Sequence, residues 1–271
     1  MCLHPRRWRK RGLSLIFALL SGCAPLAPVP AGELAFGVLG DTPYSDAEVE
    51  RLDRLIDEMN SQPLAFVVHL GDIGASAQAC GDEWLAARKA QFARIRHRFV
   101  LVPGDNEWSD CKRPMERLKR WRELFCEAPR EFCEHRRWES GGWVFVTLNV
   151  PGNNNNVRHA EHASRMRAVL SWLDEAAAAA AKGEKGLVVL MQANPFITLP
   201  RDGFRSLREK LAELPGRLSG KVVLIHGDTH LYREDEPLPG LRRIEVWGSP
   251  IVSWMRATAS PEGGVRVDAV R

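Results

Sequence analysis

The chain has 271 residues, of which 45% are hydrophobic and 27% are charged, and this length is enough to bury one full-sized core. Its formal net charge of +4 comes from 38 basic and 34 acidic residues, but residues 1–22 hold five basic residues and no acidic one. The remainder has 33 basic and 34 acidic residues, a net charge of −1, which gives no electrostatic reason to expect nucleic acid binding.

The N-terminal residues predict an exported, lipid-anchored chain. A basic start is followed by the apolar run 13–20, which is too short to span a bilayer as a finished helix. Leu20-Ser21-Gly22-Cys23 then resembles a bacterial lipobox at all four positions. The resemblance implies a signal peptide over 1–22, lipidation of Cys23, and attachment to the periplasmic side of the bacterial cell envelope through that lipid alone. An ordinary signal peptide or a buried cysteine is the alternative. Residues 23–33 form a Pro/Ala-rich tether, and a single domain is expected over 34–271.

Cysteine usage agrees with an oxidising compartment. Cys2 leaves with the signal peptide and Cys23 takes the lipid, so the mature domain keeps four cysteines: Cys80, Cys111, Cys126 and Cys133. An even number predicts two disulfides with three possible connectivities. The pairs Cys80–Cys111 and Cys126–Cys133 are favoured, because the first would join the segments after Asp72 and Asp105. The alternative, a zinc site, lacks close Cys-x-x-Cys spacing.

Hydrophobic periodicity predicts an alternation of strands and helices. Short apolar runs predict strands over 34–39, 66–70, 99–102, 143–150, 187–191 and 222–226, and at least two more from residue 242 onwards. Ser45, with Glu48 three residues later, predicts the capped start of a helix that extends to about Met59. Further helices are expected over 82–97, 159–182 and 204–214, whereas 111–140 is interpreted as a loop insertion that contains a helix opened by Pro114.

Four of the predicted strands end in the same dipeptide: Gly40-Asp41, Gly71-Asp72, Gly104-Asp105 and Gly227-Asp228. A single Gly-Asp is ordinary turn chemistry, in which the glycine permits a tight turn. If the strands are parallel, however, their carboxyl ends lie along one sheet edge, where open α/β folds bind ligands. Four carboxylates there would repel one another unless a cation neutralised them, so the sequence predicts a metal site.

The order of these signals resembles the calcineurin-like metallophosphoesterase superfamily. That family carries Asp-x-His, Gly-Asp, Gly-Asn-His-Asp/Glu, a lone His and Gly-His-x-His at successive strand ends. The corresponding stretches here are Gly40-Asp41-Thr42-Pro43, Gly71-Asp72, Gly104-Asp105-Asn106-Glu107, Gln192-Ala193-Asn194 and Gly227-Asp228-Thr229-His230. The resemblance covers residues 34–255 and is to a divergent, His-poor branch of this superfamily. It implies an α/β fold, a four-layered α/β/β/α sandwich of two mixed sheets.

The resemblance also implies a metal-ligand set. Asp72 would bridge two metals and Asp41 and His230 would hold the first. The second would be held by residues that stand where the family has Asn or His: Asp105, Asp228, and Gln192 or Asn194. Because oxygen donors replace imidazoles, one or two Mn²⁺ or Mg²⁺ ions (or Ca²⁺) are expected rather than zinc or iron.

Catalytic and substrate-binding candidates follow from the same stretches. Asn106 stands where the family has a histidine that assists the leaving oxygen, and an amide donates a hydrogen bond but no proton. His226, or His69, is the candidate substitute acid, and a buried core role is the alternative for each. The substrate-binding candidates, each of which has a structural alternative, are Tyr44, Asn149, Asn153 and Arg233.

These expectations combine into one function and one alternative. The first is hydrolysis of a small phosphomonoester or phosphodiester by a metal-bound water, in a monomeric protein. The alternative is a catalytically silent relative that binds a ligand or a partner protein.

Overall fold

The structure, a computed structural model, describes residues 28–183, 185–197, 199–260, 262 and 264–270. The predicted signal peptide, Cys23 as the predicted lipidation site and the first part of the predicted tether lie outside these residues. Among the described helices, none combines the length and the apolar character needed to cross a membrane.

Eleven strands and seven helices form the described part of the chain. The strands are β1 (Leu34–Leu39), β2 (Phe66–His69), β3 (Arg98–Leu101), β4 (Arg137–Ser140), β5 (Trp143–Thr147), β6 (Gly186–Leu190), β7 (Val222–His226), β8 (Arg233–Leu238), β9 (Leu241–Glu245), β10 (Met255–Ser260) and β11 (Gly264–Val270). The helices are α1 (Asp46–Asn60), α2 (Ser76–Ala79), α3 (Asp82–Phe92), α4 (Pro114–Phe125), α5 (Gly152–Asn155), α6 (His162–Lys182) and α7 (Arg205–Arg217).

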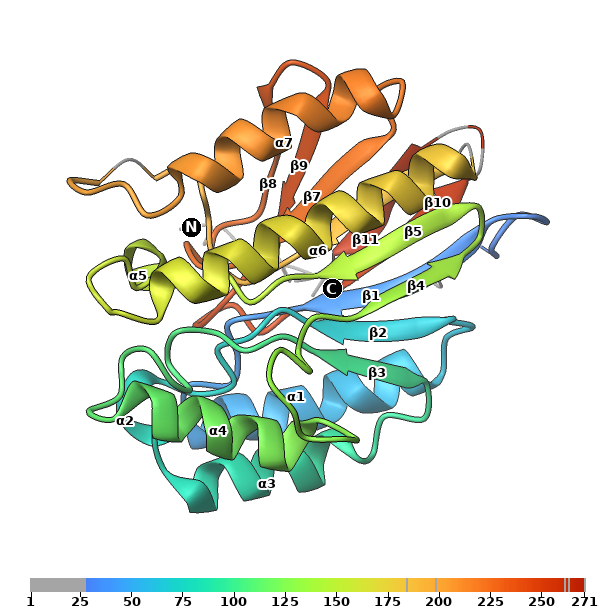
Figure 1. Cartoon of the computed structure of the whole chain (residues 1–271). Coiled ribbons are helices and arrows are strands. Elements are labelled where there is room, and N and C mark those ends of the chain that lie inside the picture. The colour runs from blue at the N-terminus through green and yellow to red at the C-terminus, as the bar shows by residue number, and fades with distance from the viewer. Residues whose placement is uncertain (1–27, 184, 198, 261, 263, 271) are drawn as a thin grey trace, which may run out of the picture.

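The strands form two mixed sheets that pack face to face. The first has the order β11-β10-β1-β2-β3 and the second the order β4-β5-β6-β7-β9-β8. Strands β1, β2 and β3 are parallel, as are β5, β6, β7 and β9, while antiparallel strands complete both sheets. Figure 1 shows α6 and α7 outside the second sheet and α1 and α3 outside the first. The predicted four-layered α/β/β/α sandwich is confirmed.

Alternate strand residues supply three separate apolar layers. Val67 packs with the buried face of α1, whereas Val68 and Phe66 face the second sheet. The second sheet packs its other face against α6 and α7, for example through Val189. Because both faces of β1, β2, β5, β6 and β7 are covered, these strands read in the sequence as nearly continuous apolar runs rather than as alternating patterns. The parallel strands are therefore held firmly, and so are the loops at their carboxyl ends.

The cap of α1 differs from the predicted reciprocal arrangement. Ser45 Oγ accepts a hydrogen bond from the Glu48 backbone N–H at 3.3 Å, as expected for an N-cap. The Glu48 carboxylate does not return to Ser45; it accepts from the Tyr44 N–H at 2.8 Å and from the Ser249 hydroxyl at 2.7 Å. Glu48 thus joins two loops that lie far apart in the sequence.

Two expectations for the secondary structure were wrong, and one strand was not predicted. Residues 137–140 are not part of a loop but form β4, since Gly141 and Gly142, both with positive φ, turn the chain back onto β5. The helix expected to end at His97 ends at Phe92, because the following residues bond the end of α1, for example Arg96 N–H to Asn60. The strands expected from residue 242 onwards, at least two, are present as β9, β10 and β11, but β8 was not predicted.

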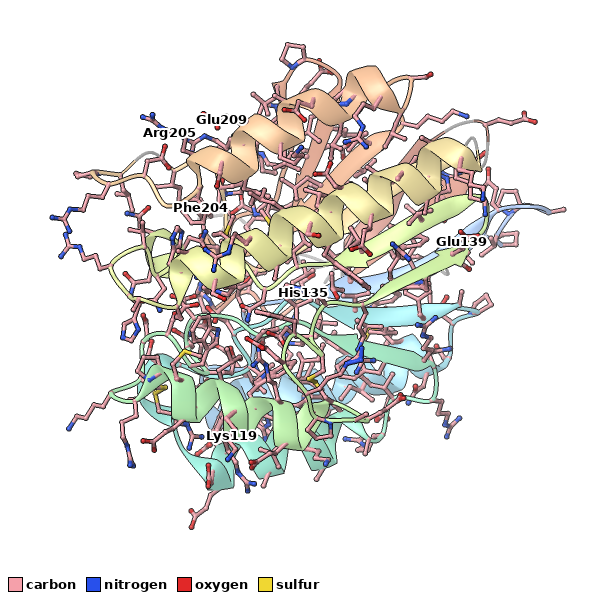
Figure 2. The ribbon with its side chains drawn as sticks, viewed as in Figure 1. Lys119, His135, Glu139, Phe204, Arg205 and Glu209 are labelled. Atoms are coloured by element: carbon pink, nitrogen blue, oxygen red, sulfur yellow. A yellow bond between two sulfur atoms is a disulfide. The ribbon has the colours of Figure 1, made fainter. Side chains whose placement is uncertain are left out.

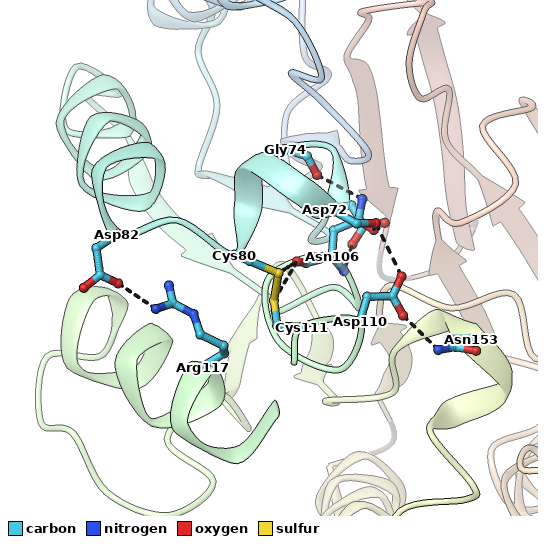
Figure 3. Close-up of a disulfide and its surroundings, with 10 residues drawn as sticks. Asp72, Gly74, Cys80, Asp82, Asn106, Asp110, Cys111, Arg117 and Asn153 are labelled. Carbon is cyan, nitrogen blue, oxygen red and sulfur yellow. Dashed lines mark hydrogen bonds and ion pairs between the residues drawn. A yellow bond between two sulfur atoms is a disulfide. The ribbon is translucent and has the colours of Figure 1, made fainter. Parts of the chain in front are cut away.

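Both favoured disulfides are present. Cys80 pairs with Cys111 and Cys126 pairs with Cys133. Figure 3 shows the first beside Asn106, whose carbonyl oxygen lies 3.7 Å from one sulfur atom and 3.5 Å from the other. A disulfide carries no S–H group, so these are packing contacts and not hydrogen bonds. The bridge therefore braces the loop after β3 next to the predicted site.

Candidate metal centre

The predicted acidic residues gather at one edge, where parallel strands of the two sheets end. Asp41 follows β1, Asp72 follows β2, Asp105 follows β3 and Asp228 follows β7. The Asp228 backbone N–H donates to both oxygens of Asp41 at 3.1 Å, which joins the two sheets across the site. Asp41 is fully buried and Asp72 is 4% exposed, so this cluster lies away from bulk water.

The aspartates, more than the glycines before them, take the unusual backbone conformation. Asp41, Asp72 and Asp228 have φ values of 51°, 55° and 86°, in the left-handed region, which is costly for a residue with a side chain. Of the four glycines that precede the acidic residues, only Gly71 has a positive φ. At three of the four turns it is therefore the aspartate that takes the left-handed conformation. This backbone conformation fixes where the three carboxylates lie.

The glycines serve instead to leave room for carboxylates from other loops. A Cβ on Gly104 would lie 1.9 Å from Asp72 Oδ1, and one on Gly227 would lie 2.0 Å from Asp41 Oδ2. A Cβ on Gly152 would lie 2.7 Å from Asp105 Oδ1 and 2.8 Å from Asp228 Oδ1. No side chain fits at these positions. The spacing of the carboxylates thus depends on the absence of a side chain at these three glycines.

Asp72 lies at the centre of the hydrogen bonds in the cluster. Its Oδ1 accepts from the Asn106 backbone N–H at 3.1 Å. Its Oδ2 accepts from the Tyr44 hydroxyl at 3.1 Å and from the Gln192 side-chain amide at 3.2 Å. These neutral donors come from both sheets, and they satisfy the carboxylate without neutralising its charge.

Burial and mutual repulsion disfavour the ionised form of these acids. Burial, with the charges of Asp105 and Asp41, raises the pKa of the Asp72 carboxyl well above its ordinary value. Burial likewise raises the pKa of Asp41, and raises that of Asp105 to about 7, with help from the charges of Asp110 and Asp228. Within the described residues no lysine or arginine forms an ion pair with these acids. The cluster therefore needs either protons or a cation.

His230 presents one nitrogen to this cluster. Its Nδ1 lies 2.7 Å from the Ser249 carbonyl oxygen, which can only accept, so the neutral ring carries its proton there. The unprotonated Nε2 then faces Tyr44 Oη at 3.4 Å and Asp41 Oδ1 at 3.8 Å. A metal-binding histidine is typically oriented in this way, with its other N–H held by a carbonyl group.

The residues suit a divalent ion by charge and donor type, although their side chains are not closed around one. In the part of the chain that the structure describes, no three His, Cys, Asp or Glu side chains are arranged to hold a metal ion. The carboxylate oxygens are turned towards backbone and amide N–H groups instead. Asp105 Oδ1 is the exception: it is buried and has no hydrogen-bond partner, which is the state expected of a ligand atom without its cation.

The two amides predicted as ligands face different partners. Gln192 Oε1 accepts from the Gly152 N–H at 2.5 Å, so its NH₂ group and not its oxygen is directed at Asp72. Asn194 donates its backbone N–H to Asp228 Oδ2 at 2.8 Å, but its side-chain oxygen accepts from Arg243 at 3.3 Å. Both residues thus act on the cluster as hydrogen-bond donors.

Asn106 lies in the cluster, as its place in the sequence predicted. Its Nδ2 donates to Tyr44 Oη at 3.0 Å and to the Gly74 carbonyl at 2.9 Å, and its Oδ1 accepts from the Ser76 hydroxyl at 2.5 Å. All these groups are engaged within the protein. Ser76 carried no signal in the sequence that could have identified it.

The two candidate acids lie outside the cluster of carboxylates. His226 follows the alternation of Val222 and Leu224, whose side chains pack on the helical face of the second sheet. Burial lowers its pKa to about 3, and its Nε2 has no partner. His69 uses both ring nitrogens on backbone groups, since Nε2 donates to the Thr42 carbonyl at 2.9 Å and Nδ1 accepts from the Gly71 N–H at 3.2 Å. These placements favour the structural alternative for both.

The substrate-binding candidates are dispersed, except for Tyr44. Asn149 is fully buried and donates to Glu134 Oε1 at 2.9 Å. Asn153 donates to Asp110 at 2.8 Å, beside the cluster, as Figure 3 shows. Arg233 lies 3.8 Å from Glu245 and makes no ion pair with the cluster. Residues 153–156 all have φ between 46° and 55°, so α5 contains a left-handed turn that asparagines tolerate better than other residues with a side chain.

Replacing Gly227 with alanine should displace the Asp41 carboxylate and lower the free energy of unfolding by about 1–3 kcal/mol, because its Cβ would overlap Oδ2. Gly216→Ala is the matched control, since a Cβ there meets nothing within 4 Å; in α7 it should stabilise the protein by up to about 1 kcal/mol. Chemical denaturation measures both values. Equal changes in the free energy of unfolding for the two substitutions would contradict the close approach of the Gly227 backbone and the Asp41 carboxylate.

Replacing His69 with glutamine, which does not titrate, should reduce acid sensitivity. Burial lowers the pKa of His69 in the folded protein from 6.5 to about 4. The unfolded chain therefore takes up the proton first, and the wild type loses stability as the pH falls from about 6.5 to about 4. Its stability relative to the variant should decrease by about 3 kcal/mol across this window. Denaturation curves at several pH values test this, and a pH-independent difference would rule out the buried neutral ring.

No protein-family model and no curated protein sequence matches the chain, but solved structures do. A dimetal phosphatase from Danio rerio matches with a TM-score of 0.58 and 16% identity, over 84% of this chain and 92% of that one. A purple acid phosphatase from yellow lupin seeds matches with a TM-score of 0.55 and 13% identity, over 84% of this chain and 49% of the other. Haemophilus influenzae NAD nucleotidase matches with a TM-score of 0.50 and 13% identity, over 88% of this chain and 49% of that one. At such identities the likeness concerns the architecture, and the chain has the calcineurin-like metallophosphoesterase fold that its sequence predicted.

Proposed function

We propose that the protein is a metal-dependent phosphoric ester hydrolase that acts on a small phosphorylated substrate. The observation that carries this proposal is the buried, unpartnered Oδ1 of Asp105 in a cluster of carboxylates with no basic partner among the described residues. Buried charges without partners are strongly unfavourable, so a site of this kind is built for a cation. The architecture shared with a dimetal phosphatase supports the same conclusion.

Two pairs of the predicted ligands approach each other. Asp41 Oδ1 lies 3.8 Å from His230 Nε2, and Asp105 and Asp228 both approach Gly152. These residues would hold one or two divalent ions, and the preponderance of oxygen donors favours Mn²⁺, Mg²⁺ or Ca²⁺ over zinc or iron. A bound divalent ion polarises phosphoryl oxygens and lowers the pKa of an attacking water.

The residues next to Asp72 donate hydrogen bonds but are poor proton donors. Asn106 is an amide, and burial together with the charge of Asp72 raises the pKa of the Tyr44 hydroxyl, so Tyr44 keeps its proton. Both groups can therefore stabilise a charged oxygen without protonating it. Substrates whose leaving group is already a stable anion, such as aryl phosphates, would be hydrolysed in preference to alkyl phosphates.

A second candidate function is binding without turnover. The specific observation in its favour is that the Asn106 amide is bound to Tyr44, Gly74 and Ser76, and that the carboxylates are turned towards N–H donors. A silent relative would keep the acidic site for a ligand or a partner protein and would show no hydrolysis.

Asp72→Asn separates these functions, because it keeps the shape of the side chain and removes its charge. The full chain should bind one or two equivalents of Mn²⁺ and hydrolyse p-nitrophenyl phosphate or its diester. The variant should lose activity by more than about a hundredfold and bind less metal. Asp82→Asn, at a 55% exposed side chain paired with Arg117, is the matched control and should behave as wild type. Elemental analysis and phenolate release provide the readouts.

Three outcomes are informative. Metal-independent hydrolysis would overturn the proposed mechanism. Metal binding without hydrolysis of any phosphate ester would favour the silent alternative. Unchanged metal content in Asp72→Asn would show that the metal binds elsewhere.

We also propose that the protein works in the bacterial envelope, on the periplasmic side, held there as a monomer by lipid on Cys23. The lipobox supports this location, and two disulfides suit an oxidising compartment.

Cys23→Ser should move the protein from the membrane fraction to the soluble periplasmic fraction, since the lipid would be its only attachment. Immunoblots of separated fractions measure this. Continued membrane association of the variant would contradict anchoring through Cys23.

A further inference from the structure

A cavity of about 560 Å³ opens at a different place from the carboxylate cluster, where the edges of the two sheets approach each other. Arg98 and Phe99 at the start of β3, the segment between α4 and β4, and Trp172 of α6 line it. Four of its lining residues are arginines: Arg98, Arg130, Arg136 and Arg137. Among the described residues that line it, Glu127 is the only acidic one, so the cavity is strongly basic.

These arginines are largely unpaired. In the described part of the chain Arg98, Arg130 and Arg136 form no ion pair with a carboxylate, and Arg137 reaches Glu175 only at 3.7 Å. The Arg98 guanidinium lies 4.9 Å from the centre of the Trp138 ring, and that of Arg137 lies 5.2 Å from the centre of the Trp172 ring. Stacking of this kind fixes the plane of a guanidinium and leaves its N–H groups free to bind an anion.

His135 adds a buried polar group to the same wall. It is 6% exposed, its Nε2 has no hydrogen-bond partner, and it lines the cavity. Figure 2 shows it in the region between α6 and β3. An imidazole N–H can donate to an anion whether the ring is neutral or charged. A buried polar atom without a partner is rare in folded proteins, and here it indicates a partner that enters the cavity.

The second disulfide gives the cavity a fixed rim. Cys126 and Cys133 both line it, and their bond closes the segment that carries Arg130. This bridge lines the basic cavity, whereas Cys80–Cys111 packs against the carbonyl oxygen of Asn106. Because the disulfide already restricts this segment, less conformational entropy is lost when the nearby arginines bind a ligand.

We propose that this cavity is a second binding site, which takes a small, multiply charged oxyanion such as a phosphate compound. Guanidinium groups bind phosphate oxygens in a bidentate manner, and the volume lies within the range of small-molecule sites. The proposal does not depend on hydrolysis at the carboxylate cluster, because none of the lining residues belongs to that cluster.

Titration calorimetry of the full chain with pyrophosphate, in EDTA at a fixed salt concentration, tests the proposal. EDTA removes divalent ions, so the carboxylate cluster cannot contribute to binding. Arg98→Gln with Arg130→Gln should weaken binding by about tenfold or more for each arginine, the loss expected for a charge-assisted hydrogen bond. Both side chains are exposed, so the fold should be kept.

The matched control removes the same charge elsewhere, through Arg54→Gln on α1 with Arg113→Gln before α4. It should bind pyrophosphate as tightly as the wild type, and so should Asp72→Asn. Backbone amides of residues 126–137 should also exchange more slowly when pyrophosphate is added. Absence of binding, or equal losses in the two double variants, would overturn the proposal, since equal losses would mean attraction by net charge alone.

Discussion

Four carboxylates, three of them buried, lie close together where the parallel strands end, and their mutual repulsion is the constraint on which this site depends. Asp41, Asp72 and Asp105 all have raised pKa values, with burial as the largest cause and the charges of neighbouring acids next. Backbone and amide N–H groups reduce this cost without removing the charge. The edge is therefore a place where either protons or a cation must be bound, and the choice between them depends on pH and on metal concentration.

Such a cluster persists because the surrounding structure leaves no room for it to relax. The parallel strands that lead into it are buried on both faces, so their ends cannot move apart without exposing apolar side chains. Gly104 and Gly227 admit carboxylates into space that any side chain would fill. The left-handed backbone of Asp41 and Asp228 costs free energy locally, and packing elsewhere offsets it. The crowding of the acids is thus a consequence of the rigidity of the sandwich.

The order of apolar runs and Gly-Asp pairs predicted the fold and the positions of Asp41, Asp72 and Asp105, because parallel strands bring their ends together whatever the loops between them. The face of the sheet on which the His226 side chain lies could not be predicted in the same way. Both faces of β7 are buried and apolar, so alternation along the strand marks neither face as the one next to the site. The orientation of the Gln192 amide could not be predicted either, since it is set by the Gly152 N–H, forty residues away in the chain.

Net charge concealed the other main feature of the molecule. Residues 23–271 are together nearly neutral, yet acidic groups gather at the strand ends and largely unpaired arginines gather at the edge between β3 and β4. Charges of opposite sign that fold apart do not neutralise each other beyond a screening length of about 10 Å. Each patch keeps its own field and can select its own ligand, a cation in one case and an oxyanion in the other. A charge count on the sequence cannot detect this separation, because it depends on which loops the two sheets bring together.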